Sequence, residues 1–197
     1  MSYQGALTRL RADVTRQVLT VWRAYGLGRI DRAALIALSA RIIAEANATA
    51  VGVADLAFSA ELTRATATVQ LPNGRLPRAY DQARLERGFS TLLDAASDGE
   101  DVTARLERFA SAEPLSAATD TYAANVQDTP TVEGWVRQLD ADPCQLCRWW
   151  WREGRVWPSS WSMQHHPGCE CTQRIVVAPK IQRVYQPGYI TPERTPV

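Results

Sequence analysis

The sequence has few of the residues and none of the motifs on which common enzyme mechanisms depend. Its only histidines are His165 and His166, so a Ser-His or Cys-His mechanism would need the same side chains that a metal site would use. No G-x-S-x-G, H-E-x-x-H or glycine-rich phosphate loop occurs along the chain. Acidic residues such as Glu133, Asp140 and Asp142 are typical of helix caps and surface charge. We therefore expect no catalytic residues and no small-molecule substrate.

A long apolar run is also missing, and lysine is almost absent. No segment approaches the roughly 18 consecutive apolar residues that a membrane span requires, and the first 17 residues lack the apolar core of a signal peptide. Lys180 is the only lysine among 22 basic residues, and the formal net charge is +1. This balance argues against electrostatic binding of the whole protein to nucleic acid or an acidic membrane. We expect a soluble protein, without a membrane partner, that is made and kept in a reducing cytoplasm.

Two long helices are predicted in the first third of the chain. Gly26 and Gly28 end the first, which begins near residue 5, and Asp31 can cap a second helix that runs to about residue 66. At 1.5 Å per residue, the second helix would be about 50 Å long, and its many alanines would let neighbouring helices approach closely. The apolar face expected for the first helix is Leu7, Leu10, Val14, Val18, Val21, Trp22 and Tyr25. The stripe expected for the second is Leu35, Leu38, Ile42, Ala46, Val53, Leu56 and Ala60.

Further helices are predicted beyond a turn. Residues 71–77 have the composition of a turn or short hairpin, and a third helix is expected at about 79–97. Asp101 is expected to cap a fourth helix, which Pro114 kinks or interrupts before the pattern resumes to about Asn125.

The pattern up to residue 140 is almost entirely helical. A short helix is predicted from Thr131 to Leu139, with Pro130 or an early Glu133 at its start. The fold class is therefore mainly α, with an elongated body of long helices.

The composition changes sharply after Asp142. Five of the seven tryptophans fall within 149–161, and residues 144–197 carry seven basic and three acidic side chains. The last 19 residues contain four prolines and no helical period, which predicts an extended arm. We therefore divide the chain into a helical body (1–140), a small Cys/His zinc-binding module with short strands (141–178) and an extended proline-rich tail (179–197).

All four cysteines lie close together in the sequence, beside the histidines. The spacing is C-x2-C-x18-H-x2-C-x-C, formed by Cys144, Cys147, His166, Cys169 and Cys171. In a reducing compartment such clustering favours a metal over disulfides, and zinc takes four thiolate or imidazole ligands. Disulfides and metal-free thiols are the two alternatives to this interpretation.

Five candidate ligands for four positions leave the ligand set open. One alternative is a four-cysteine site with His166 outside it, and the other is a three-cysteine site with His166 bound. Cys169 and Cys171 would point to opposite sides of a strand, so binding by both requires a turn. With no vacant ligand position evident, the zinc would be structural and would stabilise a segment that has little core of its own.

The segment RWWWREGRVW combines tryptophans with basic side chains. It could stack single-stranded nucleic acid, with Arg148, Arg152 and Arg155 on its phosphates. Three adjacent tryptophans cannot all face one core, so at least one is expected at a contact surface. Because Trp and Arg are favoured at protein interfaces and the local positive charge is small, a protein contact is the preferred interpretation.

The C-terminal residues resemble the signature of the phage Mu F-like minor head proteins. This signature is carried here by Cys144, Cys147, Gly154, Val156, His166, Pro167, Cys169, Cys171 and Val176. Upstream, residues 53–67 and 105–118 are similar to the helical part of related minor head proteins of actinobacterial tailed phages. The specific motif covers about 35 residues, and the weaker helical similarity about another hundred.

The resemblance implies a virion component that is assembled in the host cytoplasm and encoded near the portal. Such a protein contacts the portal or the major capsid protein and acts in head assembly or in DNA packaging and delivery. Relatives are often described as capsid maturation proteases, sometimes through fusion to a protease domain. This chain shows no separate protease segment, so that activity is kept as an alternative, together with a nucleic-acid-binding zinc module.

Overall fold

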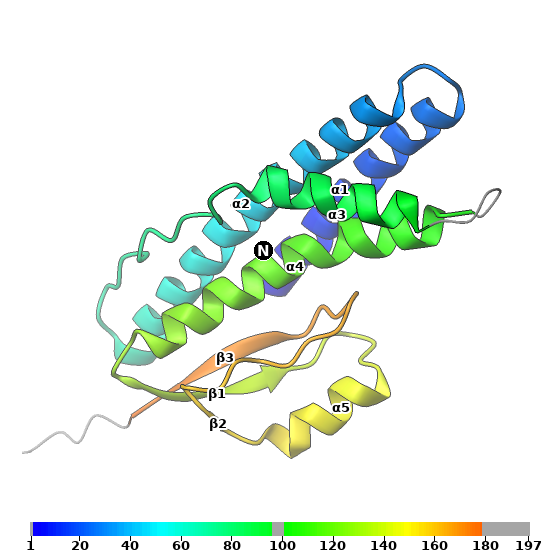
Figure 1. Ribbon diagram of the computed structural model, residues 1–197. Coiled ribbons are helices and arrows are strands. Elements are labelled where there is room, and N and C mark those ends of the chain that lie inside the picture. The colour runs from blue at the N-terminus through cyan, green and yellow to red at the C-terminus, as the bar shows by residue number, and fades with distance from the viewer. Residues whose placement is uncertain (1, 96–100, 179–197) are drawn as a thin grey trace, which may run out of the picture.

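The helical body is an elongated bundle with a small sheet on one side (Figure 1). A computed structural model describes residues 2–95 and 101–178. Helices α1 and α2 form an antiparallel pair, and α4 packs against both. The mainly helical architecture with a small three-stranded sheet confirms the predicted fold class. The bounds of the four helices are α1 Tyr3–Gly26, α2 Arg32–Thr66, α3 Asp81–Asp94 and α4 Thr103–Gln127.

The second helix begins where the sequence predicts, and the first begins two residues earlier, at Tyr3. The Ser2 hydroxyl accepts a hydrogen bond from the Gly5 N–H at 3.1 Å, and the Asp31 carboxylate accepts one from the Ala34 N–H at 2.8 Å. These side chains satisfy N–H groups that have no partner within the helix. The Asp31 cap is thus confirmed, and Leu7, Val14 and Val18 are buried as expected.

The predicted apolar stripe of α2 is only partly correct. Leu38 and Leu56 are 44% and 60% exposed, whereas the buried face is rich in alanine and also contains Ser39 and Asn47. Since α1, α3 and α4 all pack against α2, small side chains face these neighbours, and two of the larger aliphatic ones remain outside.

Helix α2 is also long and apolar enough on average to cross a membrane, the one such helix among the described residues. About 44% of its apolar 18-residue window is buried inside the protein. Its apolar character therefore fits a core helix, which contacts three other helices.

Helix α4 runs without a break through Pro114. The predicted interruption is therefore wrong, because packing of the buried residues Leu106, Leu115 and Tyr122 stabilises the helix despite the missing N–H. At its start, Asp101 accepts a hydrogen bond from the Thr103 N–H at 2.9 Å, so this side chain acts near the predicted cap position.

The predicted helix from Thr131 to Leu139 is wrong. These residues contain strand β1 (Val132–Gln138), the central strand of an antiparallel sheet of order β2-β1-β3. Its partners are β2 (Trp157–Pro158) and β3 (Thr172–Val177), both distant in the sequence. A Cβ atom on Gly134 would lie 2.1 Å from the Trp157 carbonyl oxygen, so the approach of β2 requires glycine there.

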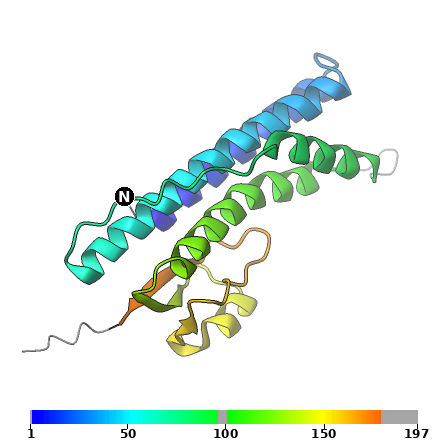
Figure 2. The same ribbon diagram turned by 60° about the vertical axis from the view of Figure 1, so that its left-hand side comes forward.

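The sheet lies between the helical body and a short helix, α5 (Gln145–Trp151), which is followed by the 3-10 turn η1 (Arg152–Gly154). Both views show α4 on one side of the sheet and α5 on the other (Figures 1 and 2). Trp135 and Met163 belong to the same buried cluster as Phe58 and Tyr122 of α2 and α4. The strands therefore share a core with the helices. The predicted tail, 179–197, lies outside the described residues.

A buried carboxylate on α2 holds the segment that connects α2 to α3. Asp55 accepts hydrogen bonds from the backbone N–H groups of Asn73, Gly74 and Arg75 at 2.8–3.1 Å, and from the Asn125 side chain at 2.8 Å. Residues 71–77 form neither a turn nor a strand but an irregular connection, so both the predicted turn and the predicted hairpin are wrong. Burial raises the pKa of Asp55, but these four hydrogen bonds outweigh burial and lower it overall.

We predict that Asp55→Ala lowers the free energy of unfolding by about 3 kcal/mol at pH 7, because three backbone N–H groups and the buried Asn125 amide lose their acceptor. Urea unfolding followed by circular dichroism measures this change. Asp13→Ala, at an exposed carboxylate on α1, is the control and should change it by less than about 0.5 kcal/mol. Equal effects of the two substitutions would contradict the role of Asp55.

The same interaction predicts a dependence on pH. Because the pKa of Asp55 is lower in the folded state than its unfolded value of about 3.9, its contribution is complete well above that pH. It is lost as the pH falls through the folded-state pKa. The difference in stability between the wild type and Asp55→Ala should therefore shrink on acidification from pH 6 to pH 3, and a constant difference would count against this account.

Candidate metal centre

Two short segments carry the five candidate ligands. Cys144 caps α5, and its sulfur accepts a hydrogen bond from the Cys147 N–H at 3.5 Å. The segment His166–Cys171 leads into β3, and the Cys169 N–H donates to the His166 carbonyl at 3.0 Å. Each segment therefore turns back on itself and directs two potential ligands toward the same side.

The structure brings these residues into direct contact. His166 Nε2 lies 3.1 Å from Cys144 Sγ and 3.2 Å from Cys147 Sγ, while Cys147 Sγ lies 3.4 Å from Cys169 Sγ. All four cysteines are free. These Cys/His groups are close enough to bind a metal ion.

Cys147 belongs to two groups of potential ligands. Within each group, the ligand atoms all lie within 4.8 Å of one another. One group is Cys144, Cys147 and His166, and the other is Cys147, Cys169 and Cys171. The Cys171 thiol also donates to an Asp140 carboxylate oxygen at 3.4 Å. The exposed neighbour His165 belongs to neither group.

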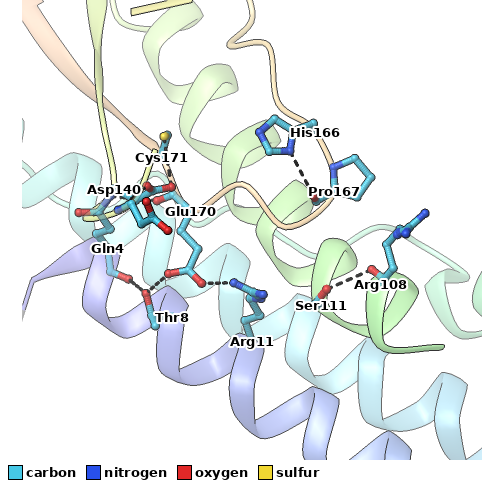
Figure 3. Close-up of polar contacts among 11 residues, drawn as sticks. Gln4, Thr8, Arg11, Arg108, Ser111, Asp140, His166, Pro167, Glu170 and Cys171 are labelled. Atoms are coloured by element: carbon cyan, nitrogen blue, oxygen red, sulfur yellow. Dashed lines mark hydrogen bonds and ion pairs between the residues drawn. The ribbon is translucent and has the colours of Figure 1, made fainter. Parts of the chain in front are cut away.

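The contacts of His166 define which of its ring nitrogens can bind a metal. His166 Nδ1 lies 3.1 Å from the Pro167 carbonyl oxygen (Figure 3). Because a carbonyl oxygen only accepts hydrogen bonds, this contact assigns the proton to Nδ1. The lone pair of the neutral ring is then on Nε2, the atom that contacts both thiols.

The protein environment raises the pKa of two of the thiols and lowers that of the other two. Burial raises the pKa of Cys147 to about 12, and a hydrogen bond to Cys169, followed by burial, raises that of Cys171. The pKa of Cys144 is lowered by the Cys147 N–H, and that of Cys169 by a hydrogen bond from Cys171. Burial therefore disfavours a thiolate at Cys147 unless a cation is close to it.

Arg137 also reaches the cluster, although no sequence motif points to it. Its guanidinium donates to Cys169 Sγ at 3.9 Å and to the Gln164 carbonyl. Residues 131–139 were predicted as a helix, so the pairing that orients Arg137 could not be foreseen. The residues of β1, VEGWVRQ, show no strict apolar–polar alternation that would indicate a strand.

Glu170, between Cys169 and Cys171, connects the cluster to the helical body (Figure 3). Its carboxylate accepts a hydrogen bond from Thr8 at 2.5 Å and forms an ion pair with Arg11, both on α1. Gln4 of the same helix donates to the Glu170 carbonyl at 3.0 Å. These contacts hold the cysteine-containing turn against α1.

The tryptophan-rich helix α5 exposes part of its surface. Trp149 is 63% exposed, while Trp150 is partly buried, with the Arg137 guanidinium 5.2 Å from its ring centroid. The prediction that the three tryptophans cannot share one core is thus correct. Arg148, Arg152 and Arg155 are exposed.

We predict that Glu170→Gln lowers the free energy of unfolding by about 1–2 kcal/mol, because a partly buried ion pair and a charge-assisted hydrogen bond are lost. Urea unfolding of both proteins in the same zinc-containing buffer tests this. Glu45→Gln removes an exposed ion pair with Arg41 and should cost less than about 0.5 kcal/mol. A Glu170→Gln effect no larger than this control would rule out the anchoring role.

Comparison with known proteins assigns no family to the chain. No family profile, curated protein or solved structure matches it. Its function is therefore inferred from its own residues and geometry, together with the resemblance carried by its C-terminal motif.

Proposed function

We propose that Cys144, Cys147, His166 and Cys169 bind one structural zinc ion. The observation that carries this is the convergence of thiol sulfurs on the Nε2 lone pair of His166. In a tetrahedral zinc site, bonds of about 2.0–2.3 Å separate the ligand atoms by about 3.5–3.8 Å. The three distances of 3.1–3.4 Å are close to these values. Cys169 does not lie within 4.8 Å of both Cys144 and His166, so binding by all four residues would require it to move toward them.

Cys171 is the candidate that this assignment places outside the ligand set. Cys169 and Cys171 both lie in the group without His166, but the Cys171 thiol donates to an Asp140 carboxylate oxygen at 3.4 Å, whereas Cys169 Sγ lies 3.4 Å from Cys147 Sγ. Soft thiolates with one imidazole favour zinc among the common divalent ions of the cell. The alternative four-cysteine site would leave His166 unbound.

The zinc would cross-link α5 to the segment that enters β3. Between β2 and Cys169, only Met163 is a buried side chain among residues 159–168. A segment with so little apolar burial needs another source of stability, and a structural metal supplies it. We assign the ion this role and no catalytic one.

We predict about one equivalent of zinc in protein purified under reducing conditions, measured by elemental analysis. His166→Ala and Cys169→Ser should each weaken zinc binding at least tenfold, because a direct ligand is lost. The matched controls His165→Ala and Cys171→Ser should keep one equivalent. Less than a tenth of an equivalent in the wild type would contradict the zinc site, and loss of zinc in Cys171→Ser with retention in His166→Ala would favour the four-cysteine alternative.

We further propose that the chain is a structural minor capsid protein of a tailed phage, located near the portal in the virion. The Cys/His motif supports this by its resemblance to the minor head proteins. The exposed residues Leu146 and Trp149, three apart on α5, support a role in protein contacts. The protein would act in head assembly or in DNA packaging and delivery by contacting the portal or the major capsid protein.

A maturation protease is the enzymatic alternative. The distance of 3.1 Å between Cys144 Sγ and His166 Nε2 would also suit a nucleophilic cysteine and its histidine base. However, the same Nε2 contacts the sulfur of Cys147 at 3.2 Å, which favours a metal site. Specific cleavage of the major capsid precursor by the wild type, lost in His166→Ala, would overturn the structural role.

A nucleic-acid-binding zinc module is the second alternative. Its supporting observation is that Trp149 is exposed beside the exposed residues Arg148 and Arg152. It requires DNA binding that weakens with salt and when Arg148, Arg152 and Arg155 are neutralised. The side chain of Arg155 already stacks on Trp157, with 4.7 Å to the ring centroid.

We predict that the chain is present in purified particles and that Trp149→Ala reduces its incorporation about tenfold, as expected for an aromatic interface residue. Quantitative mass spectrometry of particles measures this. The zinc content and circular dichroism of Trp149→Ala should equal those of the wild type, because its side chain is mostly exposed. Normal incorporation of Trp149→Ala would contradict a contact through this surface, and salt-sensitive DNA binding lost on neutralising the three arginines would favour the nucleic-acid alternative.

A further inference from the structure

A buried guanidinium lies against the thiol cluster. Arg137, in the central strand β1, is only 2% exposed. Nη1 donates to Cys169 Sγ at 3.9 Å, and Nη2 donates to the Gln164 carbonyl. The planar group also lies over the Trp150 ring, and its Nε is buried without a hydrogen-bond partner. Sulfur, a carbonyl and an aromatic face therefore surround this cation.

No carboxylate among the described residues forms an ion pair with Arg137. Arginines that do contact carboxylates, such as Arg84 and Arg11, have side chains that are about one third exposed. Burying a cation is costly unless an anion compensates it. The Gln164 carbonyl and the Trp150 ring offer partial charge only, so Cys169 is the contacting group that can carry a full negative charge.

We propose that Arg137 is a positioning residue of the metal centre and that its fixed charge balances the charge of the zinc–thiolate group. This inference rests on the zinc site proposed above. Three thiolates and one divalent ion have a net charge of −1, which one guanidinium neutralises. The same group reaches the sulfur of Cys169 and the backbone of Gln164, two residues before the ligand His166. Arginine suits this position because it remains protonated when buried and donates in two directions at once.

The test compares Arg137→Met, which removes the charge at similar volume, with Arg137→Lys, which keeps it. In the full-length chain, Arg137→Met should weaken zinc binding about 10–100-fold, as is typical for residues that contact metal ligands. Arg137→Lys should recover affinity to within about tenfold of the wild type. Competition with a chelator of known affinity measures both. The control Arg155→Met removes another arginine stacked on tryptophan in the same module and should keep affinity within about threefold.

A second readout reports on the sulfurs themselves. With Co²⁺ in place of zinc, the thiolate-to-metal charge-transfer band should shift in Arg137→Met and remain unchanged in Arg155→Met. Wild-type zinc affinity together with an unshifted band in Arg137→Met would overturn the inference. Should Arg137→Met fail to fold, Arg137→Lys decides: affinity within tenfold of the wild type supports charge balance, and a larger loss contradicts it. A wild type that binds no metal would instead refute the zinc site itself.

Discussion

The sulfur of Cys147 contacts both His166 Nε2, at 3.2 Å, and Cys169 Sγ, at 3.4 Å, and through these contacts α5 holds the segment that leads into β3. Strand β3 pairs with one edge of β1 and β2 with the other, so the position of β3 makes β1 the central strand of the sheet. Because this sulfur is buried, its thiolate form requires a nearby cation. A metal ion at this point would therefore stabilise the cluster and the path of the chain around it.

Most helices could be predicted from the sequence because their signals are local. Asp31 caps α2, and Leu7, Val14 and Val18 of α1 point inward, as the periodicity indicates. The inward face of α2 was less predictable, since three helices pack against it and small residues such as Ala50 and Ala54 fill the contacts. On hydrophobicity alone, Leu56 is a better candidate for burial than these alanines. Hydrophobicity does not indicate how closely the neighbouring helices approach.

Strand β1 and Arg137 could not be predicted, for a different reason. Residues 132–138 become a strand because they pair with 172–177, more than thirty positions away, and the pairing places Arg137 opposite Gln173. Tertiary context here overrides the local pattern. By contrast, the proximity of the four cysteines and His166 follows from two short segments that each turn back on themselves, which is why their spacing alone predicts a cluster. Choosing four ligands from the five candidates requires the distances between their sulfur and nitrogen atoms, which the sequence does not provide.

The chain uses the same physical solution at two sites where apolar burial is scarce. At the 71–77 segment, one carboxylate, Asp55, collects three backbone N–H groups, and at the cysteine cluster several thiols meet one imidazole. In both cases a polar centre holds a loop against an element with a core of its own. Glu170 has a similar role, because it lies between two cysteines and its carboxylate forms an ion pair with Arg11 of α1. Glu170 therefore links order at the cluster to the docking of the module onto α1, in addition to the core that the strands share with the helices.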